Sequence, residues 1–96
     1  MKRERISILV VGLGSIGRRH ARLLSERDDI DLLLCDSNRL FLAETQSELV
    51  GPLRESFADF ETALLVQPEI VFVCTPTSLH TIMAHQALEA GCDLFV

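Results

Sequence analysis

Residues 10–20 read VVGLGSIGRRH, and the three glycines in this stretch are central to the fold. Gly12, Gly14 and Gly17 follow an apolar run and precede a segment with the composition of a helix. A glycine-rich turn between a strand and a helix is typical of a pyrophosphate site, because the helix N-terminus attracts anions. The spacing alone is a weak signal, since a tight turn in any small α/β protein also uses glycine. The surrounding sequence has to distinguish a pyrophosphate site from an ordinary tight turn.

Short apolar runs alternate with helical segments along the 96 residues. Strands are predicted over residues 6–11, 31–35, 70–74 and 94–96, with a weaker one over 52–57 at a sheet edge. Continuous rather than alternating apolar character is typical of strands covered on both faces. The β-α alternation predicts parallel strands with right-handed crossovers. The fold class is therefore α/β, a five-stranded doubly wound parallel sheet of the Rossmann type.

Four helices are predicted between these strands. They cover residues 15–27, 38–49, 59–66 and 78–90, with Asp59 and Thr77 as N-caps and Gly91 as a stop. The first helix carries an apolar stripe of Ile16, His20, Leu23, Leu24 and Arg27. The last helix carries a stripe of Leu79, Ile82, Met83, Ala87 and Leu88. Both stripes are expected to pack on the sheet.

The register of the glycines fits a dinucleotide site. Gly12 permits the tight turn, Gly14 lets a pyrophosphate approach the backbone, and Gly17 lets the helix pack closely. Backbone N–H groups of residues 15–18 and the helix dipole then face the anion. The fingerprint also needs an acidic residue about 20 positions further on. Asp36 satisfies this, because it directly follows the apolar run LLLC.

Asp36 also bears on the choice of cofactor. At the end of the second strand its carboxylate is expected to accept hydrogen bonds from the adenosine ribose. The same charge would repel a 2′-phosphate, so NAD is favoured over NADP. Arg39 leaves NADP open, because its guanidinium could pair with that phosphate.

The segment CTPTSLH, residues 74–80, follows the fourth strand. Ligands of doubly wound sheets bind where the strand order reverses, outside the carboxyl ends of strands one and four. The chain resembles here the N-terminal domain of the glucose-fructose oxidoreductase / inositol dehydrogenase / MocA (Gfo/Idh/MocA) family. The likeness rests on VVGLGSIGRRHARLL, on the stretch FADFETALLVQPEIVFVCTPTSLHTIMAHQALEAG and on CDLFV, and its TP-x-x-x-H segment is more specific than the glycines.

The resemblance implies roles for particular residues. Those expected to contact the cofactor phosphates are Gly12, Gly14, Ser15, Ile16 and Gly17, and Asp36 is expected to contact the ribose. Those expected to line the nicotinamide side are Cys74, Thr75, Pro76 and His80. Thr77 departs from the family, which often has Asn at that position. His20 and His85 are assigned to packing or solvent.

The resemblance also implies what residues 1–96 lack. The family's Glu-Lys-Pro motif, whose lysine handles the proton, would begin where this sequence ends, and Lys2 is the one lysine, expected at the opposite end of the first strand. A separate substrate domain is likewise absent. Residues 1–96 are therefore interpreted as a partial NAD(P)-binding domain of an oxidoreductase acting on a sugar, cyclitol or related polyol, binding cofactor without catalytic residues of its own. Alternatives are a stand-alone NAD redox sensor, a Rossmann methyltransferase using S-adenosylmethionine, and a structural interaction domain.

Composition limits the classes of binding partner and the cellular compartment to be expected for the protein. A net charge of −5 argues against nucleic acid as a partner. Three cysteines without metal-ligand spacing predict no metal site and a reducing, cytoplasmic location. No apolar run approaches a membrane span. Residues 1–11 look like the start of a signal peptide, but the apolar run is short, is broken by Gly12 and Gly14 and has no small-residue cleavage site, so no signal peptide is predicted. An exposed strand edge near Leu94 and Phe95 predicts a homodimer.

Overall fold

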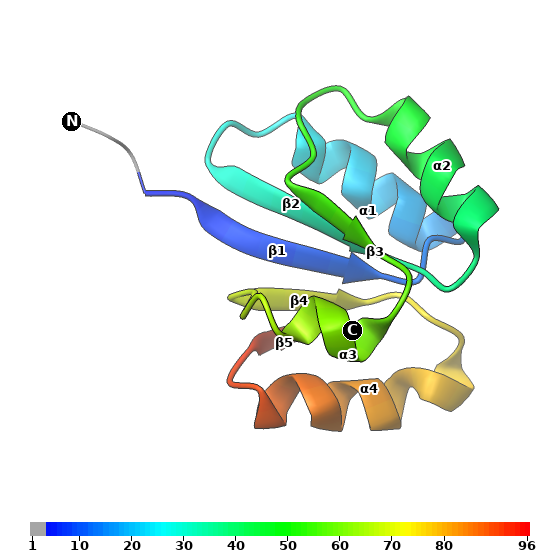
Figure 1. Cartoon of the computed structure of the whole chain (residues 1–96), viewed down its shortest axis with the longest axis vertical. Coiled ribbons are helices and arrows are strands. Elements are labelled where there is room, and N and C mark those ends of the chain that lie inside the picture. The colour runs from blue at the N-terminus through cyan, green and yellow to red at the C-terminus, as the bar shows by residue number, and fades with distance from the viewer. Residues whose placement is uncertain (1–3) are drawn as a thin grey trace.

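A computed structural model describes residues 4–96, which form a single sheet with helices on both faces (Figure 1). The elements in chain order are β1 (Ile6–Val11), α1 (Ser15–Ser25), β2 (Ile30–Cys35), α2 (Arg39–Glu48), β3 (Glu55–Phe57), α3 (Phe60–Leu64), β4 (Ile70–Val73), α4 (Thr77–Glu89) and β5 (Asp93–Phe95). Lys2 lies outside the described residues, so its expected distance from the glycine loop stays a prediction.

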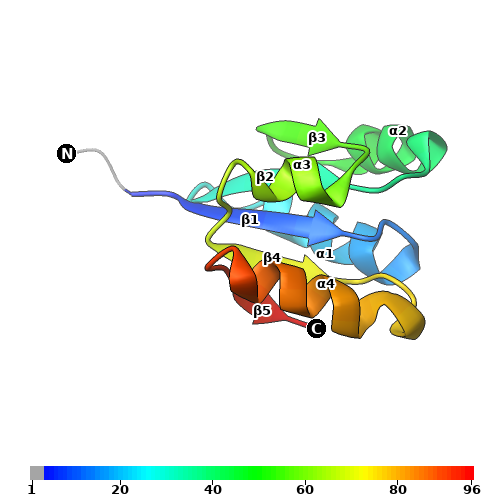
Figure 2. The ribbon, with the colours of Figure 1, turned by 60° about the horizontal axis from the view of Figure 1, so that its bottom comes forward.

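The five strands are all parallel and follow the order β3-β2-β1-β4-β5. This arrangement confirms the doubly wound sheet and the edge position of the short third strand. Figures 1 and 2 show α1 and α2 on one face of the sheet and α3 and α4 on the other. After β3 the chain crosses to the other side of β1 and continues as β4. The strand order therefore reverses between the neighbours β1 and β4. Their carboxyl ends form the switch point at which ligands bind in such folds.

The alternating side chains of β1 divide the core into two layers. Leu9 and Val11 pack in the cluster that includes Phe60 of α3 and Ala87 of α4. Ile8 and Val10 belong to the opposite cluster, with Ala21 of α1. Because β1 is covered on both faces, its sequence is apolar at nearly every position, as expected for a central parallel strand.

The prediction that the apolar stripe of α1 packs on the sheet holds only in part, because only Leu24 and His20 of the stripe meet the sheet. Ile16 is 66% exposed and Leu23 is 52% exposed, whereas the buried residues of this helix are Gly17, Ala21 and Ser25. At Gly17 the helix lies directly against the Gly12 carbonyl, so only a glycine fits at that point. The His20 ring meets Phe72 of β4 and Phe95 of β5 edge-on, at 5.4 and 5.6 Å between ring centroids.

The predicted packing of α4 needs a similar correction. Met83 and Ala87, one turn apart, pack on the core, but Ile82 is 60% exposed and Leu88 is 57% exposed. Thr77 is the first helical residue rather than the N-cap.

Pro76 takes the N-cap position of α4. Its carbonyl oxygen accepts a hydrogen bond from Leu79 N–H at 2.9 Å, and its ring holds φ at −54°. By contrast, Asp59 caps α3 as predicted, accepting a hydrogen bond from Thr62 N–H.

Candidate functional site

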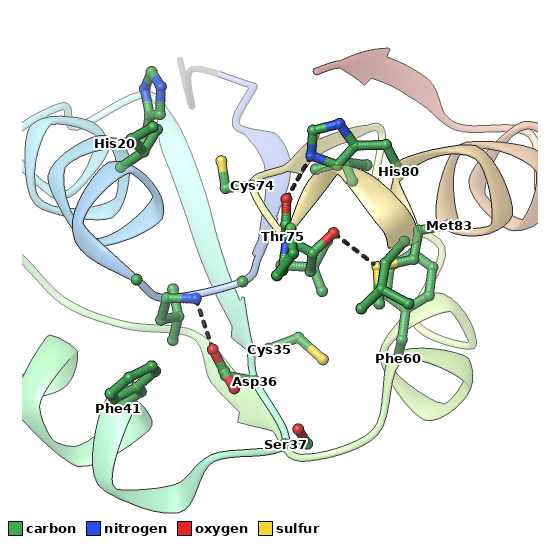
Figure 3. Close-up of a pocket in the computed structure, with 18 of the residues that line it drawn as sticks. His20, Cys35, Asp36, Ser37, Phe41, Phe60, Cys74, Thr75, His80 and Met83 are labelled. Atoms are coloured by element: carbon green, nitrogen blue, oxygen red, sulfur yellow. Dashed lines mark hydrogen bonds between the residues drawn. The ribbon is translucent and has the colours of Figure 1, made fainter.

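A cavity of about 940 Å³ opens at the carboxyl edge of the sheet, at the switch point between β1 and β4 (Figure 3). Its walls come from the loops that follow β1, β2, β3 and β4, and from the end of the chain. The lining residues are Val11–Ile16, His20, Cys35–Ser37, Phe41, Ala58–Phe60, Val73–Thr77, Leu79, His80, Met83, Phe95 and Val96. Its volume falls within the range of about 300–1,000 Å³ that is usual for ligand pockets.

Gly12 and Gly17 are required by close packing beneath the cavity floor. Gly12 has a φ of +92°, and a Cβ there would lie 2.6 Å from the Thr75 nitrogen. A Cβ on Gly17 would lie 1.7 Å from the Gly12 carbonyl oxygen. The glycine loop, α1 and the loop after β4 therefore meet backbone against backbone, and Gly17 itself does not line the cavity.

Gly14 differs from its two neighbours, because no described atom lies within 4 Å of the position its Cβ would occupy. Gly14 is the N-cap of α1, which has no side-chain cap, and Ser15 and Ile16 beside it are exposed. Arg18 N–H donates to the Gly14 carbonyl, so the N–H groups without an intrahelical acceptor are those of residues 15–17, not 15–18. An unfilled space bordered by these N–H groups suits an anion.

Asp36 fastens the loop after β2 to the glycine loop. Its Oδ2 accepts a hydrogen bond from Leu13 N–H at 2.7 Å, and its Oδ1 accepts one from Asn38 N–H at 2.8 Å. The sequence did not predict this bracing role. Each carboxylate oxygen has a second lone pair, so the group retains acceptor capacity toward the cavity.

Arg39 lies outside the cavity, exposed at the first position of α2. Phe41, two residues later, lines the cavity instead and was not predicted. The Arg18 guanidinium lies 5.6 Å from the centroid of the Phe41 ring, and its Nη1 is 3.0 Å from Glu44 Oε2. These contacts join α1 to α2 beside the Asp36 end of the cavity.

The loop after β4 is held by side chains of α4. The Thr75 hydroxyl donates to Met83 Sδ at 3.4 Å, and the Nε2–H of His80 donates to the Thr75 carbonyl oxygen (Figure 3). Cys74, Thr75, Pro76 and His80 all line the cavity, so the structure brings these predicted residues together. Met83 and Phe60, which face the same space, were expected only as a core residue and a helix residue.

Two cysteines, Cys35 and Cys74, line the cavity, and both have raised thiol pKa values. Burial, reinforced by the charges of Asp36 and Asp59, raises the pKa of Cys35 to about 12. Burial also raises the pKa of Cys74. All three cysteines are free, and within residues 4–96 no group of three histidine, cysteine or acidic side chains is placed to hold a metal ion. No helix in the same part of the chain is long and apolar enough to cross a membrane.

Comparison with known proteins connects this geometry to a family. The sequence profile of an oxidoreductase family with an NAD-binding Rossmann fold, Gfo/Idh/MocA, matches residues 6–96. D-glucoside 3-dehydrogenase of Escherichia coli (strain K12) is 34% identical over 93 residues, which are 93% of this chain and 26% of that protein.

Solved structures agree with the sequence match. Scyllo-inositol dehydrogenase from Lactobacillus casei, with bound NAD(H) and scyllo-inositol, is 27% identical with a TM-score of 0.83, over 96% of this chain and 27% of that one. GenD2 from gentamicin A biosynthesis, in complex with NAD, is 26% identical with a TM-score of 0.81, over 95% and 26%.

This chain spans about a quarter of the length of these relatives. The profile match covers nearly the whole described chain, and the cavity lies at the edge of the sheet where a doubly wound fold binds its ligand. The chain therefore belongs to the Gfo/Idh/MocA oxidoreductase family and forms its NAD-binding Rossmann domain.

Proposed function

We propose that NAD lies across the carboxyl edge of β1, β2 and β4. The pyrophosphate rests over Gly14 on the N–H groups of Ser15, Ile16 and Gly17, and Asp36 accepts from the adenosine ribose. The nicotinamide lies at the other end of the cavity, beside the residues Cys74, Thr75, Pro76 and His80. The single observation that carries this proposal is the empty space at Gly14, directly before the uncapped N-terminus of an 11-residue helix.

The proposed cofactor preference is NAD over NADP. Asp36 is anchored through both carboxylate oxygens, by Leu13 N–H and Asn38 N–H, and cannot turn away from a ribose 2′-phosphate without losing these bonds. The positive charge of Arg39 lies outside the cavity, at the start of α2. A 2′-phosphate would thus face a fixed negative charge with no cation in the described cavity wall to pair with it.

For the whole protein, we propose an oxidoreductase that moves hydride between nicotinamide and a hydroxyl-bearing carbon of a sugar, cyclitol or related polyol. When bound, NAD supplies the hydride acceptor or donor. Residues 1–96 contribute cofactor binding, orientation and a cavity with an apolar wall that includes Phe60 and Met83. Substrate binding and proton transfer are assigned to a part of the protein outside this domain. A glucoside dehydrogenase and an inositol dehydrogenase among the relatives support this substrate class.

The test is a calorimetric titration of the chain with NADH and, separately, NADPH. NADH is expected to bind more tightly, and Gly14→Ala is expected to weaken NADH binding by at least about tenfold, because the new methyl group occupies the space of the pyrophosphate. Because Gly14 has no close neighbour, its alanine variant should unfold within about 1 kcal/mol of the parent. Undiminished NADH affinity in a folded Gly14→Ala variant would contradict the proposed site.

We also propose that the chain associates through β5. This strand pairs with β4 alone among the described strands, and its last residue, Phe95, is 50% exposed. An unpaired, partly apolar edge is a template for a second copy. Sedimentation at micromolar concentration should show a dimer that Phe95→Lys converts to monomer. A parent chain that sediments as a monomer would contradict this assembly.

The compartment proposed for the protein is the cytoplasm. Cys35, Cys74 and Cys92 are all free, which suits a reducing environment. Peptide mass spectrometry of the protein purified from its native source should find Cys35, Cys74 and Cys92 unmodified, and a disulfide at any of them would contradict the proposal.

A further inference from the structure

We propose that His80 is a positioning residue, which sets the nicotinamide end of the site by holding the Thr75 carbonyl rather than by contacting the cofactor. The inference rests on the proposed NAD site. It assigns the shape of the nicotinamide half of that site to α4, the helix that follows the loop after β4. The ring of His80 lies in the first turn of α4, one turn after Pro76, and points back toward Thr75 (Figure 3).

The hydrogen bond determines which ring nitrogen carries the proton. The Thr75 oxygen is a carbonyl and only accepts, so the His80 nitrogen at this contact must be protonated. In the neutral imidazole this selects the Nε2–H tautomer and leaves Nδ1 as the acceptor. His80 therefore has one donor, and the Thr75 carbonyl occupies it.

Thr75 is held at three points, two of them by α4. Its backbone nitrogen lies against Gly12, so tightly that a Cβ on that glycine would come within 2.6 Å. Its hydroxyl donates to Met83 Sδ, and Met83 packs on the buried core. Its carbonyl accepts from His80. The first contact is fixed by the glycine loop, whereas the other two transmit the position of α4 to the loop.

The carbonyl contact is the one that orients the chain toward the cavity. The peptide unit between Thr75 and Pro76 carries this oxygen, and the proline ring limits rotation on its other side. Removing the His80 donor leaves the peptide free to turn within the space beside the nicotinamide. The adenosine end is unaffected, because Asp36 braces it independently through Leu13 and Asn38.

This separation makes a ligand comparison the sharpest test. NADH occupies both halves of the site, whereas ADP-ribose lacks the nicotinamide and occupies the adenosine half. For His80→Leu we expect the dissociation constant of NADH to rise about three- to tenfold, because a hydrogen bond that organises the site is lost. The dissociation constant of ADP-ribose should change by less than about twofold. His80→Gln should restore NADH binding, since its amide N–H can reach the same carbonyl.

A matched control is available on the same helix. His85 is exposed and does not line the cavity, so His85→Leu should leave both affinities unchanged. Imidazole ¹⁵N NMR of the unmodified chain adds a measurement that needs no variant. It should report the Nε2–H tautomer for His80, and an Nδ1–H tautomer would overturn the inference even if His80→Leu fails to fold.

The remaining outcomes separate the two proposals. Equal weakening of NADH and ADP-ribose by His80→Leu would overturn the positioning role in favour of a structural one. Failure of His80→Gln to restore NADH binding would point to direct contact by the ring and would also overturn it. If the parent chain bound neither ligand, the NAD site itself would be refuted, together with any inference about His80.

Discussion

The glycine loop after β1 and the loop after β4 face the same cavity but are held in different ways. The glycine loop is shaped by backbone contacts and by missing side chains, at Gly12 against Thr75 and at Gly17 against Gly12. The loop after β4 is shaped by side chains, through the bonds of Thr75 to Met83 and to His80. The glycine loop depends on the absence of side chains at Gly12 and Gly17, and the loop after β4 depends on side chains contributed by α4.

The difference explains how each loop responds to change. Where backbone segments are in close contact, as at Gly12 and Gly17, an added side-chain atom forces the segments apart, so a substitution there acts on the whole fold. A loop held by individual side-chain hydrogen bonds loses one contact at a time, and its variants should stay folded while local geometry changes. Asp36 combines the two patterns, since its side chain holds backbone N–H groups of the glycine loop, at Leu13, and of its own loop after β2, at Asn38.

The largest expected effect is that of Gly17→Ala on stability. The added methyl would overlap the Gly12 carbonyl oxygen at 1.7 Å, so α1 must move away from the sheet. We expect the free energy of unfolding to fall by about 3 kcal/mol or more, measured by urea denaturation followed by circular dichroism. Gly14→Ala is the matched control, three residues away in the same loop. Equal stability of the two variants would remove the distinction between a packing glycine and a ligand-facing one.

A smaller effect is expected when the Asp36 brace is removed from the cofactor-free chain. Asp36→Ala leaves Leu13 N–H and Asn38 N–H without their acceptor, and should lower the free energy of unfolding by about 1–3 kcal/mol. Asp36→Asn retains one carbonyl oxygen and should fall between Ala and the parent. Faster amide exchange at Leu13 should accompany the loss. An unchanged exchange rate there would show that the brace does not hold the loop.

The smallest effect concerns the two cavity cysteines, Cys35 at the end of β2 and Cys74 in the loop after β4. Burial raises the pKa of Cys35 to about 12, so its thiol stays protonated at pH 8. Cys74 is half-buried, and its pKa is raised mainly by burial. Iodoacetamide should therefore modify Cys74 before Cys35, as read by peptide mass spectrometry, with equal rates in denaturing urea as the control.

The raised pKa of Cys35 also predicts how its contribution to the free energy of unfolding changes at alkaline pH. Unfolded Cys35 loses its proton near pH 8.5, whereas the folded thiol keeps it until about pH 12. Its contribution to stability is full below pH 8.5 and declines as the pH rises toward 12. The difference in unfolding free energy between the parent and Cys35→Ala should shrink accordingly. A difference that grows with pH would contradict the burial of the thiol.

Much of the fold could be predicted from the sequence. The bounds of β1, the parallel topology and the edge position of β3 all followed from runs of apolar residues and their spacing. The packed faces of α1 and α4 followed only in part, because Leu24 and Met83 meet the core while Ile16, Leu23, Ile82 and Leu88 remain exposed. Hydrophobic periodicity identifies a stripe, but the distance between helix and sheet decides which stripe is buried.

The candidate site shows the same division. Gly12, Gly17 and Asp36 lie in a recognisable spacing, and each makes the close contact or hydrogen bond that organises the cavity. Phe41 and Phe60 carry no local signal of a role in the site and reach it only because α2 and α3 begin at the same edge of the sheet. The second use of Asp36, as a brace, was likewise invisible in the sequence.

The sequence by itself determined the doubly wound parallel sheet, the family, the glycine loop and the acidic residue after β2. Each of these depends on residue type at short range, where glycine conformation and apolar runs act directly. The tertiary structure alone decided that Gly14 faces open space, that Arg39 lies outside the cavity, and that His80 and Met83 hold Thr75. These features depend on how closely distant segments approach, and that distance follows from the packing of the whole domain.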